Sequence, residues 1–256
     1  MKLSSVAVQL YTLRDHCKTP VAIAETLRKV AAIGYQAVQA SGLGPIEESE
    51  LVRLCKENKL TLCATHESGP LILAEPAKVV ERLKKLGCKH TAYPYPAGID
   101  FGSEASVAEL ISKLDAAGKV FAEAGLTLSY HNHNHEFRKL NGRVILERIY
   151  AETNPRYLQG EIDTYWVQYG GGNPAAWCRS LKNRLPLLHM KDYRTNNNAA
   201  PEYAEIGQGT LDWKEIISAA EASGCEWFIV EQDTTPGDPF DSLKMSFDYI
   251  RDHLVN

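Results

Sequence analysis

Four ionisable side chains near the ends of four β-rich segments offer the donors of a metal site. They are His131, Asp163, His189 and Glu231, in the second half of the 256-residue chain. Two imidazoles and two carboxylates suit Mn, Co, Zn or Fe better than Ca. Such groups gathered in one buried region are costly without compensation, and a divalent cation supplies it most simply. The alternative is a solvated hydrogen-bond network that holds no metal.

Several nearby groups are candidates for moving a proton. Glu231 is the first candidate for a base, because a carboxylate that holds a metal can still use its second oxygen. Lys191 is the next, since a lysine beside a cation should have a lowered pKa. Glu136 is a third predicted catalytic group, and Glu161 is predicted to bind substrate. The alternatives are a loop carboxylate for Glu136 and, for Glu161, a carboxylate that supports Lys191 or a histidine.

Aromatic and polar residues near the same segments are predicted to bind substrate. His66 is expected to face substrate oxygens, and Tyr11 and Trp166 are expected to form apolar walls for one face of a sugar. His133 is a rival to His131 as the ligand from its segment, and is otherwise an acid or a support for a ligand. Gln9 completes the predicted substrate-binding set. For His66 and the two aromatic residues, packing in the core is the alternative role.

The elements that must position these residues alternate regularly along the chain. Short β-rich segments alternate with longer amphipathic segments, in units of about 30 residues. The predicted strands cover 6–13, 37–41, 61–66, 90–95, 126–133, 157–163, 185–192 and 227–233. The predicted helices cover 20–33, 46–58, 75–86, 104–124, 143–152, 174–182, 212–222 and 239–254, with Thr19, Asn173 and Asp212 as expected N-caps. Eight such units without a break in composition predict one domain over 1–256, a single (β/α)8 TIM barrel of the α/β class. The alternative is a doubly wound sheet.

The alternation within the strands predicts which side chains enter the barrel. Successive strand residues point to opposite faces. Phe228 and Val230 suit the helix layer, so Glu231 and Asp233 should face inward. The same reasoning turns further polar residues inward: Ser129, His131 and His133; Glu161 and Asp163; His189 and Lys191. Because active sites of such barrels lie at the C-terminal ends of the strands, the four candidate ligands should meet there.

Composition and motifs exclude several classes of function. The net charge is -4, from 28 basic and 32 acidic residues, which argues against a nucleic-acid partner. No G-x-G-x-x-G follows the first strand, and no P-loop pattern occurs, so a nucleotide site has no support. No apolar stretch approaches the roughly 20 residues of a membrane span, and no signal peptide is visible, which predicts a cytoplasmic protein without a membrane partner. The six cysteines form no C-x-x-C pair and are expected to be buried thiols in a reducing compartment: Cys17, Cys55, Cys63, Cys88, Cys178 and Cys225.

The sequence resembles the xylose isomerase-like barrel superfamily, in particular its sugar phosphate isomerase/epimerase group. That group includes ketose 3-epimerases, hydroxypyruvate isomerase and inosose dehydratase. The matching segments are 8–15, 130–133, 161–166, 189–192 and 206–213, which together span nearly the whole chain. The resemblance implies one divalent ion, which would be Mn, Co, Zn, Fe or Mg, held by His131, Asp163, His189 and Glu231.

One position departs from the pattern that the resemblance implies. In the ketose epimerases the ligand from strand five is a glutamate that also acts as an acid and base, whereas the corresponding residue here is His131 or His133. A site with one carboxylate fewer leaves the ion a stronger Lewis acid. It also removes one of the two carboxylates that flank the reacting carbon, which argues against simple epimerisation by two bases.

The resemblance predicts a metal-dependent sugar isomerase or epimerase. Such an enzyme removes a proton next to a metal-chelated carbonyl and forms an enediolate. The alternative is a lyase or dehydratase that uses the same site on a keto-sugar, an inosose or a 3-keto-glycoside and expels a β-leaving group. A second alternative is a carbohydrate-binding barrel without catalysis. The expected partner is a small carbohydrate, and a homo-oligomer is compatible with the sequence.

Overall fold

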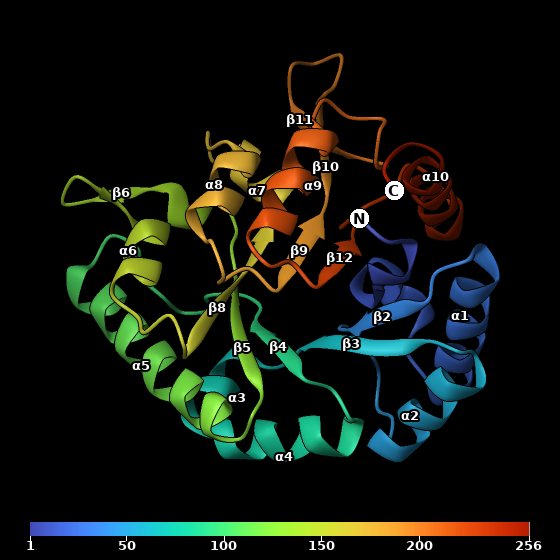
Figure 1. The fold of residues 1–256 in the computed structure, drawn as a ribbon, viewed down its shortest axis with the longest axis horizontal. Coiled ribbons are helices and arrows are strands. Elements are labelled where there is room, and N and C mark those ends of the chain that lie inside the picture. The colour runs from blue at the N-terminus through green and yellow to red at the C-terminus, as the bar shows by residue number, and fades with distance from the viewer. Residues whose placement is uncertain (256) are drawn as a thin grey trace.

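The computed structural model describes residues 1–255, which form a closed barrel of eight parallel strands (Figure 1). The strands follow one another around the ring in sequence order, and the last pairs with the first to close it. Their bounds are β1 Val6–Gln9, β2 Ala37–Ala40, β3 Thr61–His66, β4 His90–Tyr93, β5 Thr127–His131, β8 Leu158–Asp163, β9 Leu187–Met190 and β12 Trp227–Val230. The predicted (β/α)8 fold is confirmed.

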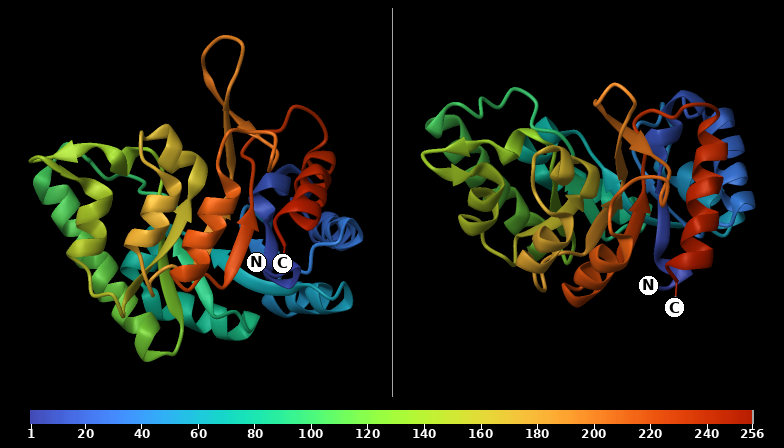
Figure 2. Two further views of the ribbon diagram at one scale, coloured as in Figure 1. Left: turned by 45° about the horizontal axis from the view of Figure 1, so that its top comes forward. Right: turned by 90° about the horizontal axis from the view of Figure 1, so that it is seen from above.

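Helices lie outside the strands, and the two termini lie close together (Figures 1 and 2). Their bounds are α1 Pro20–Ile33, α2 Glu48–Glu57, α3 Gly69–Ala74, α4 Pro76–Leu86, α5 Glu104–Glu123, α6 Ile145–Ala151, α7 Thr164–Tyr169, α8 Pro174–Ser180, α9 Trp213–Ala222 and α10 Pro239–His253. Within residues 1–255, none of these helices combines the length and the apolar character needed to cross a membrane. The side chains of Thr19, Asn173 and Asp212 each accept a hydrogen bond from a backbone amide of the helix that follows, as predicted.

Two apolar layers confirm the predicted direction of the strand side chains. Leu188 and Phe228 belong to the large core between the strands and the helices. Leu187 and Ile229, their neighbours in the chain, belong to a small cluster inside the barrel with alanines and a cysteine. Odd-numbered residues of β9 and β12 therefore face inward. Small apolar side chains fill the lower part of the barrel and leave its C-terminal end to polar residues.

The structure differs from the predicted elements where strands were expected to continue beyond the ladder. β1 ends at Gln9 and a 3-10 helix, Leu10–His16, follows it. The ladder between β1 and β2 also ends at Gln9, so the chain beyond it has no strand to join. β5 likewise ends at His131, which leaves His133 in the loop that follows. The helix predicted over 143–152 begins as a short strand, β7 Arg143–Val144, before α6.

Additional elements lie on the C-terminal side of the barrel or in its connections. β10 Asp192–Thr195 and β11 Pro201–Ala204 form an antiparallel hairpin that projects from the barrel (Figure 1). A second hairpin pairs β6 Lys139–Leu140 with β7. The short helices α3 and α7 were absent from the predicted elements. All six cysteines are free thiols, and five of them are buried as expected.

Candidate functional site

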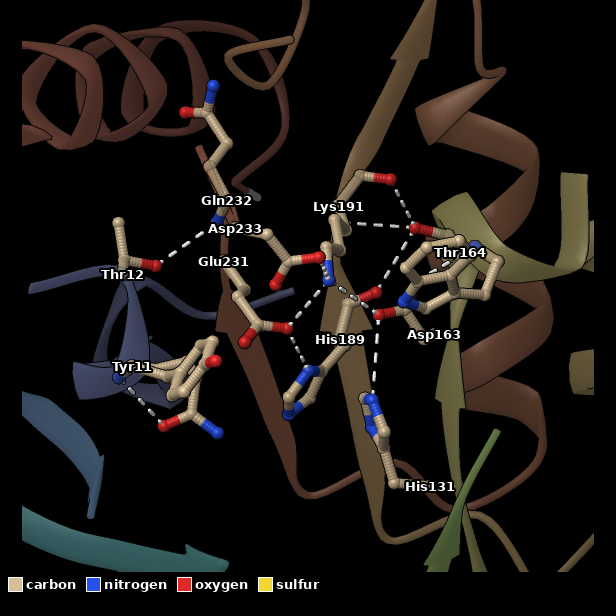
Figure 3. A network of polar contacts seen from close by, with 12 residues as sticks. Tyr11, Thr12, His131, Asp163, Thr164, His189, Lys191, Glu231, Gln232 and Asp233 are labelled. Atoms are coloured by element: carbon tan, nitrogen blue, oxygen red, sulfur yellow. Dashed lines mark hydrogen bonds and ion pairs between the residues drawn. The ribbon is translucent and has the colours of Figure 1, made fainter. Parts of the chain in front are cut away.

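The four predicted metal ligands meet at the C-terminal end of the barrel (Figure 3). We call His131, Asp163, His189 and Glu231 the upper cluster. All four are buried, and one donor atom of each lies within 4.8 Å of the others. His131 Nε2 is 3.8 Å from Asp163 Oδ2, and His189 Nδ1 lies 2.9 Å from Glu231 Oε2. The register explains this convergence, because Asp163 pairs with His189 and places the two side chains at one level.

Asp163 divides its two oxygens between the fold and the upper cluster. Oδ1 accepts a hydrogen bond from Trp166 N at 3.0 Å and caps α7. The side-chain oxygen Oδ1 of Asn132 accepts a hydrogen bond from the backbone N–H of Asp163 at 3.0 Å and fixes the end of β8. Among the described residues, Oδ2 has no hydrogen-bond partner although it is buried. This oxygen lies 3.8 Å from His131 Nε2 and 3.4 Å from Lys191 Nζ but accepts no hydrogen bond from the described residues, which is consistent with a divalent cation at this point.

Lys191 stands beside the upper cluster among three carboxylates. Its Nζ lies 2.9 Å from Asp233 Oδ2, 3.2 Å from Glu231 Oε2 and 3.4 Å from Asp163 Oδ2. Burial alone would lower the pKa of this ammonium, but the three carboxylates outweigh it and raise the pKa well above its usual value. The lowering of the Lys191 pKa that the sequence predicts belongs to a lysine beside a bound cation, and among the carboxylates alone the shift has the opposite direction. That prediction placed a cation beside the lysine and did not count the surrounding carboxylates.

Burial and neighbouring charges shift the pKa values of the upper cluster in opposite directions. Burial lowers the pKa of His131 to about 3, with His189 adding to the effect. Burial also raises the pKa of Asp163 to about 7, although Lys191 opposes this. Burial alone would lower the pKa of His189, but Glu161 and Glu231 outweigh it and raise the value to about 10. The pKa values of the two imidazoles are thus shifted in opposite directions.

A second polar set lies one step deeper in the barrel. We call His66, His131, Glu161 and His189 the lower cluster, because these residues also bring one donor atom each within 4.8 Å of one another. His66 Nε2 donates to Glu161 Oε2 at 2.5 Å. His189 Nε2 lies 3.4 Å from Glu161 Oε1, and His131 Nδ1 lies 3.2 Å from Glu161 Oε2. The two clusters share His131 and His189.

A cavity of about 700 Å³ opens above the upper cluster. Four residues predicted to bind substrate line it, namely Tyr11, His66, His133 and Trp166. The proposed base Glu231 and its neighbour Lys191 also line it. The volume exceeds that of one sugar ring, and aromatic rings on its walls suit the apolar face of a sugar.

Three residues predicted to act in catalysis or substrate binding lie outside the lining of this cavity. Glu136 is fully buried and accepts hydrogen bonds from the Tyr130 hydroxyl at 2.8 Å and from His133 N at 3.0 Å. Burial raises its pKa to about 7. It therefore holds the loop after β5, and the geometry does not support its predicted catalytic role. Gln9 and Glu161 are also fully buried and do not line the cavity, so direct contact with substrate is not supported for either residue.

Several polar residues of the site were not predicted from the sequence. Gln39 bonds both Glu161 and His189 from inside the barrel. Its inward parity on β2 was the available signal. Arg14 lines the cavity and donates to the carbonyl oxygens of Tyr11 and Asp233. It lies within the N-terminal matching segment, but its spacing from the predicted strand gave no reason to select it.

Comparison with known proteins agrees with this architecture. Residues 27–253 match the family model described as xylose isomerase-like TIM barrel. A relative, the inosose dehydratase of Geobacillus thermodenitrificans, is 28% identical over 160 residues, which are 56% of this chain and 53% of that protein. The inosose dehydratase of Mesomycoplasma hyopneumoniae is 23% identical over 89% of this chain and 87% of its own length. The first of these alignments therefore spans about half of the relative.

A solved structure has the same fold. It is a sugar phosphate isomerase/epimerase from Parabacteroides distasonis, with a TM-score of 0.84, 19% sequence identity and coverage of 99% of this chain and 96% of that one. At this identity the likeness concerns the fold. Because the family model matches most of the sequence and the barrel closes as that family requires, the chain belongs to the xylose isomerase-like TIM barrel family.

Proposed function

We propose that the protein is a metal-dependent lyase that dehydrates a keto-sugar or a keto-polyol. The observation that carries this proposal is the position of one carboxylate and one ammonium on the same side of the cavity. Glu231 and Lys191 lie 3.2 Å apart and both line the cavity. A base and an acid on one wall suit the removal of a proton and of a neighbouring hydroxyl group from one face of a substrate.

The upper cluster fits a divalent cation by its donor atoms and by the buried Asp163 oxygen that accepts no hydrogen bond among the described residues. His131, Asp163, His189 and Glu231 would hold the ion. When bound, a divalent ion supplies Lewis-acid polarisation of a substrate carbonyl oxygen. The donor set of two imidazoles and two carboxylates suits Mn, Co, Zn or Fe.

The chain's own residues would then perform the proton transfers. Glu231 would take the proton from the carbon beside the carbonyl, since a carboxylate that holds an ion can still offer its second oxygen. Lys191 gives a proton to the hydroxyl on the next carbon, and that group leaves as water. Asp233, at 2.9 Å from Lys191 Nζ, keeps the ammonium directed toward the cavity. Trp166, which lies 5.4 Å from Lys191 Nζ, covers the ammonium and limits its access to water.

The curated relatives support elimination as the reaction. Inosose dehydratases at 28% and 23% identity remove water from a keto-polyol, as their name states. An isomerase is the second candidate, because a single base and a single acid on one face also suit the transfer of a proton between neighbouring carbons. Epimerisation needs a second base on the opposite face. His66 and His133 also line the cavity, and burial together with His131 lowers the pKa of His133.

The test is incubation of the protein with inososes, ketoses and 3-keto-glycosides in deuterated water. The dehydratase predicts loss of water or of the β-substituent, dependent on added Mn²⁺ or Zn²⁺ and abolished by a chelator. Deuterium incorporation with an intact substrate skeleton would instead support the isomerase. Sugar binding that persists after chelation, without proton exchange on any substrate, would contradict both and indicate a binding barrel.

A further inference from the structure

The lower cluster is built around a carboxylate that no solvent reaches. Glu161 is fully buried on β8, two residues before Asp163, and does not line the cavity. Its register partner on the neighbouring strand is His131. An isolated carboxylate at such a depth is strongly unfavourable, so its retention requires nearly complete compensation by donors.

Every polar neighbour of Glu161 offers a hydrogen. Gln39 Nε2 donates to Oε1 at 2.7 Å, and His66 Nε2 donates to Oε2 at 2.5 Å. His131 Nδ1 and His189 Nε2 lie 3.2 Å and 3.4 Å from the two oxygens. A carboxylate only accepts hydrogen bonds when ionised, so the first two contacts place hydrogen on Gln39 Nε2 and His66 Nε2. The contacts of His131 and His189 with Glu161 are ion-pair distances, and His131 Nδ1 forms no hydrogen bond among the described residues.

The side chains of Gln39 and Gln9 continue this pattern of donors and acceptors to His189. Because Gln39 Nε2 donates to Glu161, Gln39 Oε1 must face the other way. There it accepts from Gln9 Nε2 at 3.0 Å and from His189 Nε2 at 2.7 Å. His189 Nε2 therefore carries hydrogen, and the nitrogen left for a ligand is Nδ1. That atom faces the upper cluster.

The same hydrogen bonds also determine which nitrogen of His66 carries hydrogen. Gln9 Nε2 also lies 3.3 Å from His66 Nδ1 and can only donate, so His66 Nδ1 accepts. His66 Nε2 must then carry the hydrogen that Glu161 accepts. Both oxygens of Glu161 thus accept hydrogen bonds, from Gln39 and from His66, while His131 Nδ1 lies 3.2 Å from Oε2 without forming a hydrogen bond. In the upper cluster the carboxylate oxygen without a hydrogen bond to any described residue belongs to Asp163.

We propose that Glu161 is a positioning residue that orients both histidines of the upper cluster, so that His131 Nε2 and His189 Nδ1 face the metal. The inference rests on the proposed metal-dependent function and adds to it the reason for the orientation of the ligands. Glu161 acts through these histidines and does not touch substrate. A carboxylate that accepts from the second nitrogen of a ligand histidine orients the ring and strengthens it as a ligand.

The test measures the dissociation constants of Mn²⁺ and Zn²⁺, by competition with a chelator, for a graded pair of variants. Glu161→Gln keeps one acceptor oxygen and Glu161→Met keeps none at a similar volume. We expect affinity to fall about 10-fold for Gln and about 100-fold for Met, the range found for groups that support metal ligands. The matched control is Glu205→Gln, which alters another buried carboxylate, bonded to Ser242 and outside both clusters. It should bind metal as the wild type does.

A second variant and a second measurement protect the test against misfolding. Gln39→Met leaves Glu161 in place but removes the acceptor of His189 Nε2, and should weaken metal binding about 10-fold. In ¹⁵N spectra of the Zn²⁺-loaded wild type, one histidine should be bound through Nδ1 and one through Nε2. In the variants, each of these histidines should bind Zn²⁺ through a mixture of its two nitrogens.

The outcomes separate this inference from the proposed function. Wild-type protein that binds metal, with variants at Glu161 and Gln39 that bind it equally well, would overturn the positioning role and leave the metal site intact. Binding of the ion by His66 and Glu161 themselves, seen as a third histidine signal that shifts with Zn²⁺, would also overturn it. Wild-type protein that binds neither ion would overturn the proposed function as well.

Discussion

Asp163 offers a substitution that separates metal binding from folding. Its Oδ1 accepts the hydrogen bond that caps α7, while its buried Oδ2 faces the upper cluster without a hydrogen-bond partner. Asp163→Asn keeps an oxygen for the cap, since asparagine is as good an N-cap as aspartate. The same substitution puts a neutral amide NH2 group in place of the charged Oδ2, and this group does not attract a cation. Asp163→Ala removes both functions.

The expected magnitudes follow from these two roles. At a metal concentration of about 100 times Kd, binding stabilises the wild type by about 2.7 kcal/mol. For a chain of this size that raises Tm by about 5–10 °C. If Asp163→Asn weakens binding about 100-fold, the same concentration equals Kd and the gain falls to about 0.4 kcal/mol, or roughly 1–2 °C. Without metal, Asp163→Ala should lose about 1 kcal/mol more than Asp163→Asn, which is the value of the cap.

Thermal unfolding of the three proteins, with and without Mn²⁺ or Zn²⁺, measures both effects. The wild type after chelation is the control for the metal-free state. A full metal-induced rise in Tm for Asp163→Asn would refute the assignment of Oδ2 to the metal. Equal Tm values for Asp163→Asn and Asp163→Ala without metal would refute the role of Oδ1 as a cap.

Three further outcomes test the site and its support. Lys191→Met should lower kcat roughly 100- to 10,000-fold if Lys191 is the acid, with metal affinity measured in parallel to exclude loss of the ion. The pKa of Glu136, raised by burial to about 7, means that the folded state holds its proton more tightly than the unfolded chain. The contribution of Glu136 to stability should therefore be complete below about pH 4.5 and be lost as the pH rises to about 7. Glu136→Gln should remove this contribution in urea titrations, while that of Asp163 remains, and should keep kcat/KM within about 3-fold, because the Glu136 side chain lies outside the cavity. Asp192→Ala should cost about 3 kcal/mol in the same titrations, because it strips partners from Trp213 Nε1 and the amide of Gly207, whereas unchanged stability would contradict this support.

The order of the elements and the direction of their side chains could be predicted from local sequence. Alternation within β9 and β12 is set by the pleat, so apolar Leu188 and Phe228 fixed the inward direction of His189 and Glu231. The eight repeated units then implied that strand ends converge. For this reason four residues separated by up to 100 positions could be assigned to one cluster before any coordinates.

Where an element stops depends on its neighbours, and this limited the prediction. His133 was expected on a strand, but the ladder of β5 with β8 ends at His131, so His133 lies in a loop that Glu136 holds. Glu136 illustrates the same limit, because a carboxylate near a predicted active site is equally able to bond a tyrosine behind it.

The amino-acid sequence by itself determined the barrel, its closure by eight units and the donors that it directs inward, because periodicity and parity are properties of neighbouring residues. Only the tertiary structure decided that Lys191 is surrounded by carboxylates and that Glu161 and Gln39 lie beneath the histidines. Those facts depend on distances between side chains of different strands. They also depend on the low dielectric of the barrel interior, which makes each unpaired donor or charge costly and so selects one arrangement.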